Sequence, residues 1–468
     1  MLQNETKETI IIGAGLTGLT LAHKLNQNQQ DFLVLEKSHR PGGVIQTKEK
    51  EGFVYETGPN TGIVKYGEVA ELFEEIKSYC TPEIPDESVK KRFIWKNGRW
   101  HQLPSGLKGG IQTDLFTWKD KFRILGEPFR KPGNDPHESL DNMVRRRMGE
   151  SFLNYAVDPF ILGVYAGDPS KIIPKYALPK LYYLEQDYGS FIGGAVKKKR
   201  EKKEPTEKKA TKNVFSVKNG LENLVTALYN SAGIHNFLLG SEDINVIPNE
   251  NGGFDVKYKR NETVYKLKAR NVIFTVGTYE LKGLMSFPEK DLLDIIDNLE
   301  YAKVIHAAVG FNHWEGCPLS GFGGLVPYVE KRDILGALFM SAFLSGRAPE
   351  SGELLSVFLG GTRREDIYSK TDKEIKEIIG KELKSMFNLP DFQPDLLELN
   401  RYEHAIPQYG KESGSRIEAI EQLEEKYPGL ILAGNMRDGI GMADRIKQAC
   451  DITKRLNKNS TSNNRKSL

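Results

Sequence analysis

The start of the chain combines two apolar runs with one helical repeat. Residues 9–12 (TIII) form a short β-branched run that ends at a glycine, and residues 31–36 (DFLVLE) form a second apolar run. Between them, from about Gly15 to Asn28, apolar side chains recur at helical spacing. A strand, a glycine turn, a helix and a second strand in this order predict a βαβ unit.

Helical patterns dominate from roughly residue 65 to residue 210. A stripe of apolar residues at i, i+4, i+7 and i+11 predicts a helix packed into the core, with membrane contact as the alternative. The lysine-rich stretch 197–212 ends this part of the chain and predicts a solvated loop, with contact to anionic lipid as its alternative. The apolar stripe consists of Trp118, Phe122, Leu125 and Phe129.

Strand and helix patterns alternate again after the lysine-rich stretch, so the chain as a whole favours an α/β fold (α+β in its mixed part). The polar tail 456–468 is expected to be disordered. The expected elements in between are a strand, turn and helix over 215–233, several strands over 243–276, further strands over 300–360, a charged helix near 373–387, a buried strand over 429–435 and a helix from about Met442.

Composition and charge exclude several classes of protein. The 468 residues carry a formal net charge of +3, and residues 197–212 alone hold nine Lys and Arg against three Glu, or +6. Basic residues therefore do not spread over a face, and no nucleic-acid partner is expected. Three dispersed cysteines predict no disulfide framework, and the eight histidines form no metal-binding pattern. A polar N-terminus and the lack of a long apolar run favour the cytoplasm.

The turn after the first apolar run carries three glycines at fixed spacing. Gly13 permits the tight turn, Gly15 lets the backbone approach a pyrophosphate, and Gly18 lets the helix pack on the strand. The helix N-terminus adds unpaired N–H groups for phosphates. Glu36, at the end of the second run, can accept hydrogen bonds from ribose hydroxyls. The segment is Gly13-Ala14-Gly15-Leu16-Thr17-Gly18, and a purely structural turn is its alternative.

A second glycine pair follows the acidic residue. Nicotinamide binding does not require it, but it is typical of FAD enzymes, in which this segment runs along the phosphates and the flavin ring. Arg40 can pair with a phosphate or a nearby acid, and the alternative for the whole segment is an exposed turn. The segment is Glu36-Lys37-Ser38-His39-Arg40-Pro41-Gly42-Gly43, followed by Val44.

A third glycine turn lies near the end of the chain, where it again joins a strand to a helix. Backbone N–H groups at the start of that helix can face the flavin or its ribityl chain. Two nucleotide-type turns so far apart predict a discontinuous FAD domain, with the other domains inserted between its parts. The residues of this turn that we expect at the cofactor are Gly434, Ile440, Gly441 and Met442.

From about residue 9 to residue 455 the chain resembles the FAD-dependent protoporphyrinogen oxidase and coproporphyrinogen III oxidase family, within the flavin amine oxidase superfamily. The G-V-Y-A-G-D-P and G-F-G-x-L-V-P segments are specific to this branch, whereas the glycine turns are shared by the superfamily. The segments that carry the resemblance are 55–60 (YETGPN), 91–93 (KRF), 103–107 (LPSGL), 158–169 (DPFILGVYAGDP), 321–327 (GFGGLVP) and 358–361 (FLGG).

The resemblance implies a discontinuous Rossmann-like FAD-binding domain, a β-sheet substrate domain and a helical membrane-facing insertion. The FAD-binding domain is expected over 1–75, 213–295 and 415–455. The substrate-binding domain is expected over 76–105 and 296–414, and the helical domain over 106–212. The family also implies a cleft lined by apolar side chains, which suits a flat ring system.

Residue roles carried over from the family complete the site. Arg92 would meet a propionate carboxylate, Leu325 and Leu338 would sandwich one pyrrole ring, and Phe358 would stack on another. Gly163 would offer its backbone carbonyl to pyrrole N–H groups. On the cofactor side, Val246 would contact the adenine, and Gly58, Pro59 and Asn60 would lie along the flavin.

Some positions depart from the family patterns. Val44 stands where many amine oxidases have Arg, which weakens an amine oxidase interpretation. Asn60 stands where some porphyrinogen oxidases have Arg, so a carboxylate contact there is in doubt. Lys218-Asn219-Gly220 replaces the usual glycine pair near that helix start. No cysteine lies near residues 401–404, where monoamine oxidases anchor flavin covalently, so the FAD is expected to be noncovalent.

The expected reaction removes six electrons from a porphyrinogen in three hydride transfers to the flavin, with oxygen or another molecule as the final acceptor. No catalytic dyad is needed, and the sequence suggests none. Protoporphyrinogen IX is the first candidate and coproporphyrinogen III the second. The alternatives are an oxidase or desaturase of amines or carotenoids and, outside enzymes, a binding module for prenylated proteins. Peripheral contact with the inner face of the cell membrane and a homodimer are left open.

Overall fold

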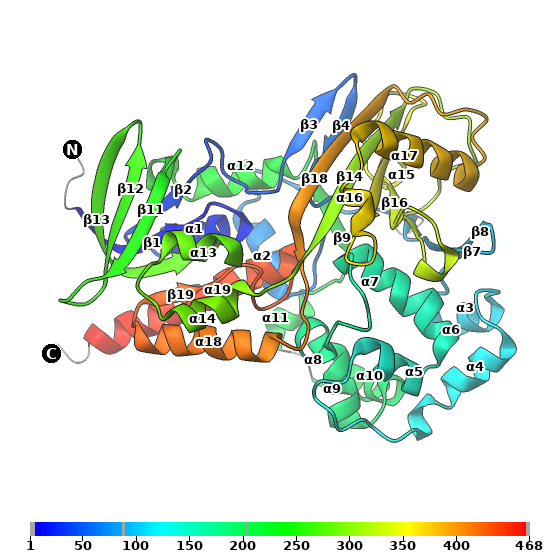
Figure 1. The fold of residues 1–468 in the computed structure, drawn as a ribbon, viewed down its shortest axis with the longest axis horizontal. Helices are drawn as coiled ribbons and strands as arrows, with labels where there is room; N and C mark the ends of the chain where they lie inside the picture. The colour runs from blue at the N-terminus through cyan, green and yellow to red at the C-terminus, as the bar shows by residue number, and fades with distance from the viewer. Residues whose placement is uncertain (1–4, 87–88, 203, 465–468) are drawn as a thin grey trace.

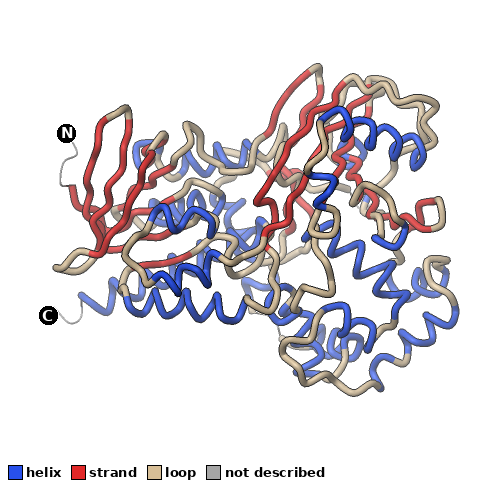
Figure 2. Tube along the Cα trace, viewed as in Figure 1, coloured by secondary structure: helices blue, strands red, loops and turns tan. Residues whose placement is uncertain are grey.

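The computed structural model describes residues 5–86, 89–202 and 204–464. The chain forms a mixed α/β fold with two seven-stranded sheets and a region built from helices, residues 106–208. Figure 1 places the first sheet at the left, the second at the upper right and this helical region below the second. Figure 2 shows the same division, with the strands in two main groups and helices gathered at the lower right.

The first sheet takes its strands from the start, the middle and the end of the chain. Its order is β10 (Phe237–Leu239), β2 (Phe32–Glu36), β1 (Glu5–Ile12), β13 (Thr263–Phe274), β12 (Phe254–Arg260) and β11 (Glu242–Pro248), and β19 (Leu430–Leu432) pairs with β13. Helix α1 (Leu16–Gln27) connects β1 to β2, which run parallel. The predicted βαβ unit is therefore confirmed.

Alternate side chains of the first sheet enter two separate cores, as the period of two in a strand requires. Ile11 packs with helices α1, α12 (Glu222–Ser231) and α19 (Met442–Asn464) on one face. Ile10 and Ile12 pack with α13 (Thr278–Leu284), α14 (Lys290–Asp297) and α18 (Ser413–Lys426) on the other. Helices thus cover both faces, which explains the unbroken apolar runs in the sequence.

The second sheet has the order β18 (Leu396–Pro407), β14 (Tyr301–Phe311), β17 (Glu353–Gly360), β16 (Gly336–Phe339), β15 (Gly323–Leu325), β7 (Arg92–Lys96) and β8 (Arg99–Gln102). One face packs on α17 (Asp372–Phe387) through a core that includes Ile305, Val357 and Ile379. The helix predicted near 373–387 is confirmed. The other face of the sheet turns toward the segment 57–60 and α7 (Asp158–Tyr165), and it carries the candidate substrate residues described below.

The helical region and the short connecting elements complete the fold. The helical region contains α3 (Gly106–Gln112), α4 (Trp118–Leu125), η2 (Glu127–Phe129), α5 (Leu140–Arg147), α6 (Glu150–Phe152), η3 (Leu153–Val157), α7, α8 (Pro174–Ala177), α9 (Pro179–Tyr188), α10 (Phe191–Arg200) and α11 (Pro205–Lys208). The connecting elements are β3 (Thr47–Lys50), β4 (Phe53–Glu56), β5 (Gly62–Ile63), α2 (Gly67–Glu75), β6 (Pro82–Glu83), β9 (Val214–Val217), α15 (Met340–Phe343) and α16 (Glu365–Tyr368).

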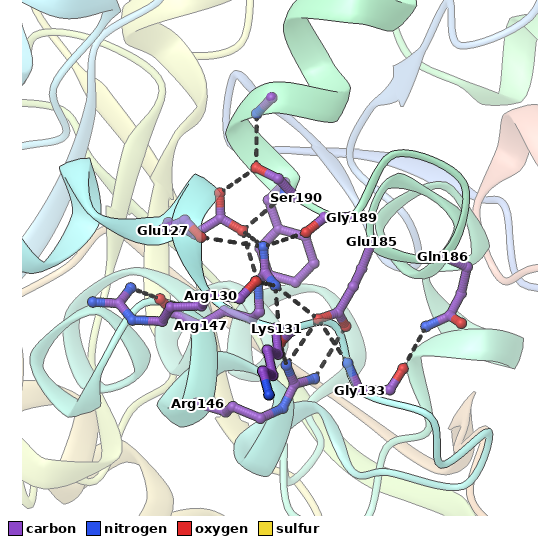
Figure 3. A network of polar contacts seen from close by, with 12 residues as sticks. Glu127, Arg130, Lys131, Gly133, Arg146, Arg147, Glu185, Gln186, Gly189 and Ser190 are labelled. Atoms are coloured by element: carbon purple, nitrogen blue, oxygen red, sulfur yellow. Dashed lines mark hydrogen bonds and ion pairs between the residues drawn. The ribbon is translucent and has the colours of Figure 1, made fainter.

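A buried network of charges holds the helical region together (Figure 3). The Arg147 guanidinium, on α5, is fully buried and forms an ion pair with Glu127 of η2. It also donates to the carbonyl oxygens of Arg130 and Gly189, both at 2.9 Å. Glu127 in turn accepts a hydrogen bond from the Ser190 hydroxyl at 2.7 Å, just before α10. One buried pair therefore fixes the contact between several helices.

The apolar stripe predicted for the core is exposed instead. Helix α4 buries none of its residues, and a capping box between Thr117 and Asp120 stabilises its N-terminus. Phe129, just beyond this helix, is 91% exposed. The prediction was wrong because periodicity reveals an apolar face without revealing what covers it. The other exposed members of the stripe are Trp118, Phe122 and Leu125.

Two further expectations need correction. The lysine-rich stretch is mostly solvent-exposed over residues 197–202 and 204–212, but residues 197–200 continue α10 and residues 205–208 form α11, so it is not simply a loop. Helix α19 continues to Asn464, so the structure describes residues 456–464 of the expected disordered tail as a helix. Leu456 packs into the core beside α1, and the Asn457 side chain accepts a hydrogen bond from Gln30 at 2.7 Å. Residues 465–468 lie outside the described residues.

We expect the substitution Arg147→Met to destabilise the helical region, because it leaves the Glu127 carboxylate buried without its charge partner. Removing one member of a buried pair costs about 3–5 kcal/mol. Arg145→Met is the matched control, since Arg145 lies on the same helix and its ion pairs with Asp141 and Glu150 are partly exposed. Urea unfolding should separate the two variants clearly. Equal unfolding midpoints would show that the buried pair is not needed.

Candidate active site

The carboxyl ends of four parallel strands meet at one edge of the first sheet. Ile12 of β1 pairs with Leu35 of β2 and with Phe274 of β13, which pairs with Leu432 of β19. The residues that follow these positions therefore lie side by side. All three predicted glycine turns begin at or next to this edge, which is where open α/β sheets bind their ligands.

The first glycine turn has the geometry of a phosphate-binding turn. Gly13 has a φ of +103°, and its N–H donates to the Leu35 carbonyl at 2.8 Å. A Cβ on Gly18 would lie 2.0 Å from the Gly13 carbonyl oxygen, so only glycine allows this helix to approach the turn. A Cβ on Gly15, by contrast, would meet nothing within 4 Å. Protein atoms therefore pack tightly around Gly13 and Gly18, whereas the space next to Gly15 is free. This arrangement fits a pyrophosphate beside Gly15.

Glu36 is fixed at the end of β2 by the backbone of both neighbouring turns. Its carboxylate accepts hydrogen bonds from the N–H groups of Ala14 at 2.7 Å and Ser38 at 2.8 Å. Each oxygen keeps lone pairs that can accept ribose hydroxyls. Lys37, expected at the cofactor, forms an ion pair with Glu280 at 2.5 Å on the protein surface. Its contact with the cofactor stays a prediction.

The second glycine pair docks directly on the first turn. Gly42 has a φ of +105°, and its N–H donates to the Ala14 carbonyl at 2.8 Å. Gly43 has a φ of +58°, and a Cβ there would lie 3.4 Å from the Gly15 Cα. Both positive φ values favour glycine. The two motifs that sequence reasoning treated separately therefore form one backbone surface.

Arg40 contacts backbone carbonyl groups in this structure, and its pairing with a phosphate stays a prediction. Its guanidinium donates to the carbonyl oxygens of Pro41, Gly43 and Ile45 at 3.1, 2.6 and 3.0 Å. The guanidinium group thus provides hydrogen-bond donors for three carbonyl groups of the tight turn. In this structure Arg40 stabilises the glycine turn through these hydrogen bonds. The next residue of the segment, Val44, is exposed.

The third glycine turn starts α19 at the same edge. Gly434 has a φ of +94°, and its N–H donates to the Gln448 side chain at 2.9 Å. The Gly441 N–H donates to the Asp444 carboxylate at 3.1 Å, while Gly441 itself stays exposed. Ile440 packs against the helical region and Met442 against the core of the first sheet. The turn thus joins both parts of the molecule.

Outside the three glycine turns, the segment 57–60 connects the cofactor edge to the second sheet. A Cβ on Gly58 would lie 2.0 Å from the Val44 carbonyl oxygen, so this segment packs on the second glycine turn. Asn60 is buried, and its side-chain oxygen accepts a hydrogen bond from the Ser356 hydroxyl of β17 at 2.7 Å. The Tyr402 hydroxyl of β18 donates to the Thr57 carbonyl at 2.7 Å. Segment 57–60 therefore covers part of the second sheet.

A buried ion pair, which the sequence analysis did not predict, lies directly before this segment. Glu56 and Arg347 are both fully buried, and their charged groups lie 3.0 Å apart. Burial raises the pKa of the Glu56 carboxyl, while Arg347 and the Leu221 N–H oppose that rise. No local signal in the sequence could have found the pair, because its members are 291 positions apart.

The structure brings all five predicted substrate residues to one face of the second sheet. Strand register places Leu325 opposite Gly336, and Gly336 opposite Phe358, in one row. The neighbouring row contains Arg92, Gly323 and Leu338, because Gly323 pairs with both Arg92 and Leu338. A Cβ on Gly163 of α7 would lie 2.3 Å from the Leu325 side chain, so α7 contacts this face directly. We call it the substrate face.

Val246 lies apart from these residues. It is a residue of β11, its side chain is fully buried in the core of the first sheet, and its backbone forms an isolated β-bridge to Met285. Its contact with an adenine stays a prediction. Among residues 5–86, 89–202 and 204–464, no cluster of His, Cys, Asp and Glu could hold a metal ion.

Comparisons with known proteins agree with this geometry. The model of the family described as flavin containing amine oxidoreductase matches residues 16–450. The mitochondrial protoporphyrinogen oxidase of Nicotiana tabacum is 27% identical, over 96% of this chain and 94% of its own length. The coproporphyrinogen III oxidase of Bacillus subtilis (strain 168) is 25% identical, over 94% of this chain and 96% of its own. A crystal structure of a candidate protoporphyrinogen oxidase from Exiguobacterium sp. 255-15 superposes with a TM-score of 0.78 at 20% identity, covering 97% of this chain and 99% of that one.

We expect the substitution Gly15→Val to abolish flavin binding without unfolding the protein. Gly15 has a φ of −71°, which any residue adopts, and its missing side chain leaves the space where we place the pyrophosphate. Gly283→Val is the control, because a Cβ there also meets nothing within 4 Å. Flavin absorbance per mole of purified protein measures the effect. Full flavin content in Gly15→Val would exclude this turn as the phosphate site, and flavin that stays with acid-precipitated protein would exclude noncovalent binding.

Proposed function

The chain belongs to the flavin containing amine oxidoreductase family, and from that premise we propose that it oxidises a porphyrinogen to a porphyrin in haem biosynthesis. The observation that carries the proposal is the convergence of Arg92, Leu325, Leu338, Phe358 and Gly163 on the substrate face. Protoporphyrinogen IX is the proposed substrate, because the relatives with the higher identities, 27–28%, are protoporphyrinogen oxidases.

The residues of the substrate face suit a large flat ring that carries few charges. Leu325, Leu338 and Phe358 are all partly exposed and present apolar surface, which binds rings and excludes water. Gly163 is exposed at the point where α7 meets Leu325, so we assign its carbonyl as an acceptor for pyrrole N–H groups. FAD, when bound at the glycine turns, supplies the hydride-accepting chemistry. We propose molecular oxygen as the final electron acceptor.

Arg92 is proposed to anchor a propionate carboxylate. Its guanidinium is exposed and lies 5.4 Å from the centroid of the Phe322 ring, a cation–π contact that holds the side chain near the face. Within the described part of the chain, no carboxylate forms an ion pair with it. A planar guanidinium can grip a carboxylate through two parallel hydrogen bonds. An apolar slot alone would accept a disc in several orientations, and one charged anchor selects among them.

We expect Arg92→Ala to lower kcat/KM by about ten- to hundredfold, since losing a charge-assisted hydrogen bond costs about 1.5–3 kcal/mol. Flavin content should stay unchanged, and Arg92→Lys should recover part of the loss. Lys91→Ala is the control, because Lys91 is exposed and directly precedes β7, so the variant removes a neighbouring positive charge without altering the strand. Porphyrin fluorescence and oxygen uptake, with protoporphyrinogen IX and coproporphyrinogen III tested side by side, measure the effect. Full activity in Arg92→Ala would place the anchor elsewhere, and faster turnover of coproporphyrinogen III would replace the proposed substrate.

We further propose that the helical region contacts the inner face of the cell membrane peripherally, through α4. The exposed stripe on and beside this helix is mixed with basic residues, among them Lys121, whose ammonium lies 4.6 Å from the Trp118 ring centroid. Aromatic side chains beside basic ones are typical of helices that lie in the interface of anionic membranes. Among the described residues, no helix is long and apolar enough to cross a bilayer.

We expect the double variant Trp118→Ser, Phe122→Ser to lose binding to vesicles that contain phosphatidylglycerol, because it removes the apolar surface that would enter the interface. Ile234→Ser is the control, since Ile234 is similarly exposed outside the helical region. Co-sedimentation at low and high salt measures both contributions, and salt should weaken binding because ions screen the basic residues. Vesicle binding that is unchanged in the double variant would exclude α4 as the contact.

A further inference from the structure

Two arginines lie buried beside the third glycine turn, residues 434–441. Arg416 of α18 is 2% exposed, and Arg445, in the first turn of α19, is 8% exposed. Arginine stays charged inside proteins. A charge taken out of water is costly without a partner, and a cation near the positive N-terminal end of a helix adds to that cost. Both positions therefore cost stability, which points to a use of these charges beyond stability.

The acids around the turn are paired with other cations. Asp444 forms its ion pair with Lys65 at 2.7 Å, and Asp438 forms one with Arg437 at 3.3 Å. Neither of the two buried guanidinium groups forms an ion pair with a carboxylate of the described residues. Burial lowers the pKa of both groups, and more distant acids oppose this only in part. Two positive charges are thus left without a direct counter-charge.

Both guanidinium groups contact the backbone of the turn. Arg416 Nε donates to the carbonyl oxygen of Met436 at 3.3 Å. Arg445 Nη2 donates to the carbonyl oxygens of Arg437 and Gly439 at 2.9 and 2.8 Å. Three carbonyl groups of one short segment therefore point toward the two arginines, and the positive charges lie directly against the turn.

The N–H groups of the same peptides point the other way. In a planar trans peptide the N–H is directed opposite to the carbonyl, so the N–H groups of Asp438 and Ile440 are directed away from the arginines. Within the described ranges, neither N–H donates to a protein acceptor. The turn thus presents free donors on one side and holds two cations on the other, which makes its open side electropositive.

We propose that Arg416 and Arg445 stabilise the negative charge that bound FAD gains on reduction, and so raise its reduction potential. The inference rests on the FAD site of the proposed function and deepens it, whichever substrate is oxidised. Each hydride transfer moves two electrons and one proton from the substrate to the flavin, which gains one negative charge, and a second proton leaves the substrate for water. Charge beside a flavin tunes its chemistry, and buried charges are little screened. Both arginines act through the turn as positioning residues.

The test measures the two-electron midpoint potential of the FAD-loaded protein against a reference dye, so it needs no substrate. We expect Arg445→Gln, which removes the charge but keeps hydrogen-bond donors, to lower the equilibrium constant for reduction about tenfold, a shift of about 30 mV to more negative potential. Arg445→Lys keeps the charge and should stay close to the unmodified protein. An unchanged potential in Arg445→Gln would overturn the inference.

A second variant changes the charge without removing an arginine. The Gln448 side-chain oxygen accepts a hydrogen bond from Arg445 Nη1 at 3.0 Å. Gln448→Glu keeps an oxygen at this position and adds a negative charge beside the guanidinium, so it should also lower the potential. This variant decides the question where Arg445→Gln fails to fold, and an unchanged potential in Gln448→Glu would then overturn the inference.

Arg455→Gln is the matched control. Arg455 lies on the same helix, but its side chain is 50% exposed and pairs with Glu424 at 2.7 Å. Its removal should leave the potential unchanged, because solvent screens an exposed charge. A shift as large as that in Arg445→Gln would contradict the inference, since any cation on α19 would then have the same effect.

The potential also separates the charge from a purely structural role. A loosened turn would weaken the binding of oxidised and reduced FAD alike, whereas the potential changes only with the difference between the two affinities. Equal losses of both affinities in Arg445→Gln, with no change in potential, would overturn the inference. Porphyrinogen turnover by the unmodified protein is measured separately, and FAD-loaded protein without such turnover would overturn the proposed function instead.

Discussion

The buried ion pair between Glu56 and Arg347 fixes how the two sheets of this protein meet. Glu56 ends β4, directly before the segment 57–60 that packs on part of the second sheet. Its carboxylate also accepts hydrogen bonds from the Thr47 hydroxyl at 2.7 Å and the Leu221 N–H at 2.9 Å. Arg347, from the chain that follows α15, donates to the Ser216 hydroxyl at 3.0 Å as well. A charge left alone there would be very costly, so the pair holds these segments in one arrangement. The distance between cofactor edge and substrate face depends on it.

The candidate cofactor site is made mainly of backbone. The contacts that shape it are N–H and carbonyl groups of the three glycine turns, together with the Glu36 carboxylate that accepts two of those N–H groups. A site of this kind constrains glycines at a few positions and leaves most side chains free to change. This accounts for a fold that is kept at 20% sequence identity, with a TM-score of 0.78 to a solved structure.

Sequence patterns predicted those elements that depend on residues close together in the chain. The βαβ unit and the helix near 373–387 follow from apolar periodicity, and both were confirmed. Gly13 and Gly18 were predicted from the spacing of the first glycine turn and Gly42 from a glycine pair typical of FAD enzymes, and their contacts explain why glycine stands there. The stripe around Phe129 was misjudged because the same period serves a core and an interface. Arg347 could not be predicted, since its ion pair is formed with a residue far away in the chain. Leu325 and Phe358 were found through family resemblance and not through any property of their own.

The order of the strands in the first sheet has a consequence for the synthesis of this protein. Its two central strands, β1 and β13, emerge from the ribosome well before β19, which completes the cofactor edge together with Gly434 and α19. The helical region is made before β13, and the strands β14 to β18 of the second sheet are made between β13 and β19, so all of them leave the ribosome before the cofactor edge is complete. Domains tend to fold as units during synthesis. Here the unit closes only when β19 and α19 have been made, so the complete edge forms late relative to the rest of the fold.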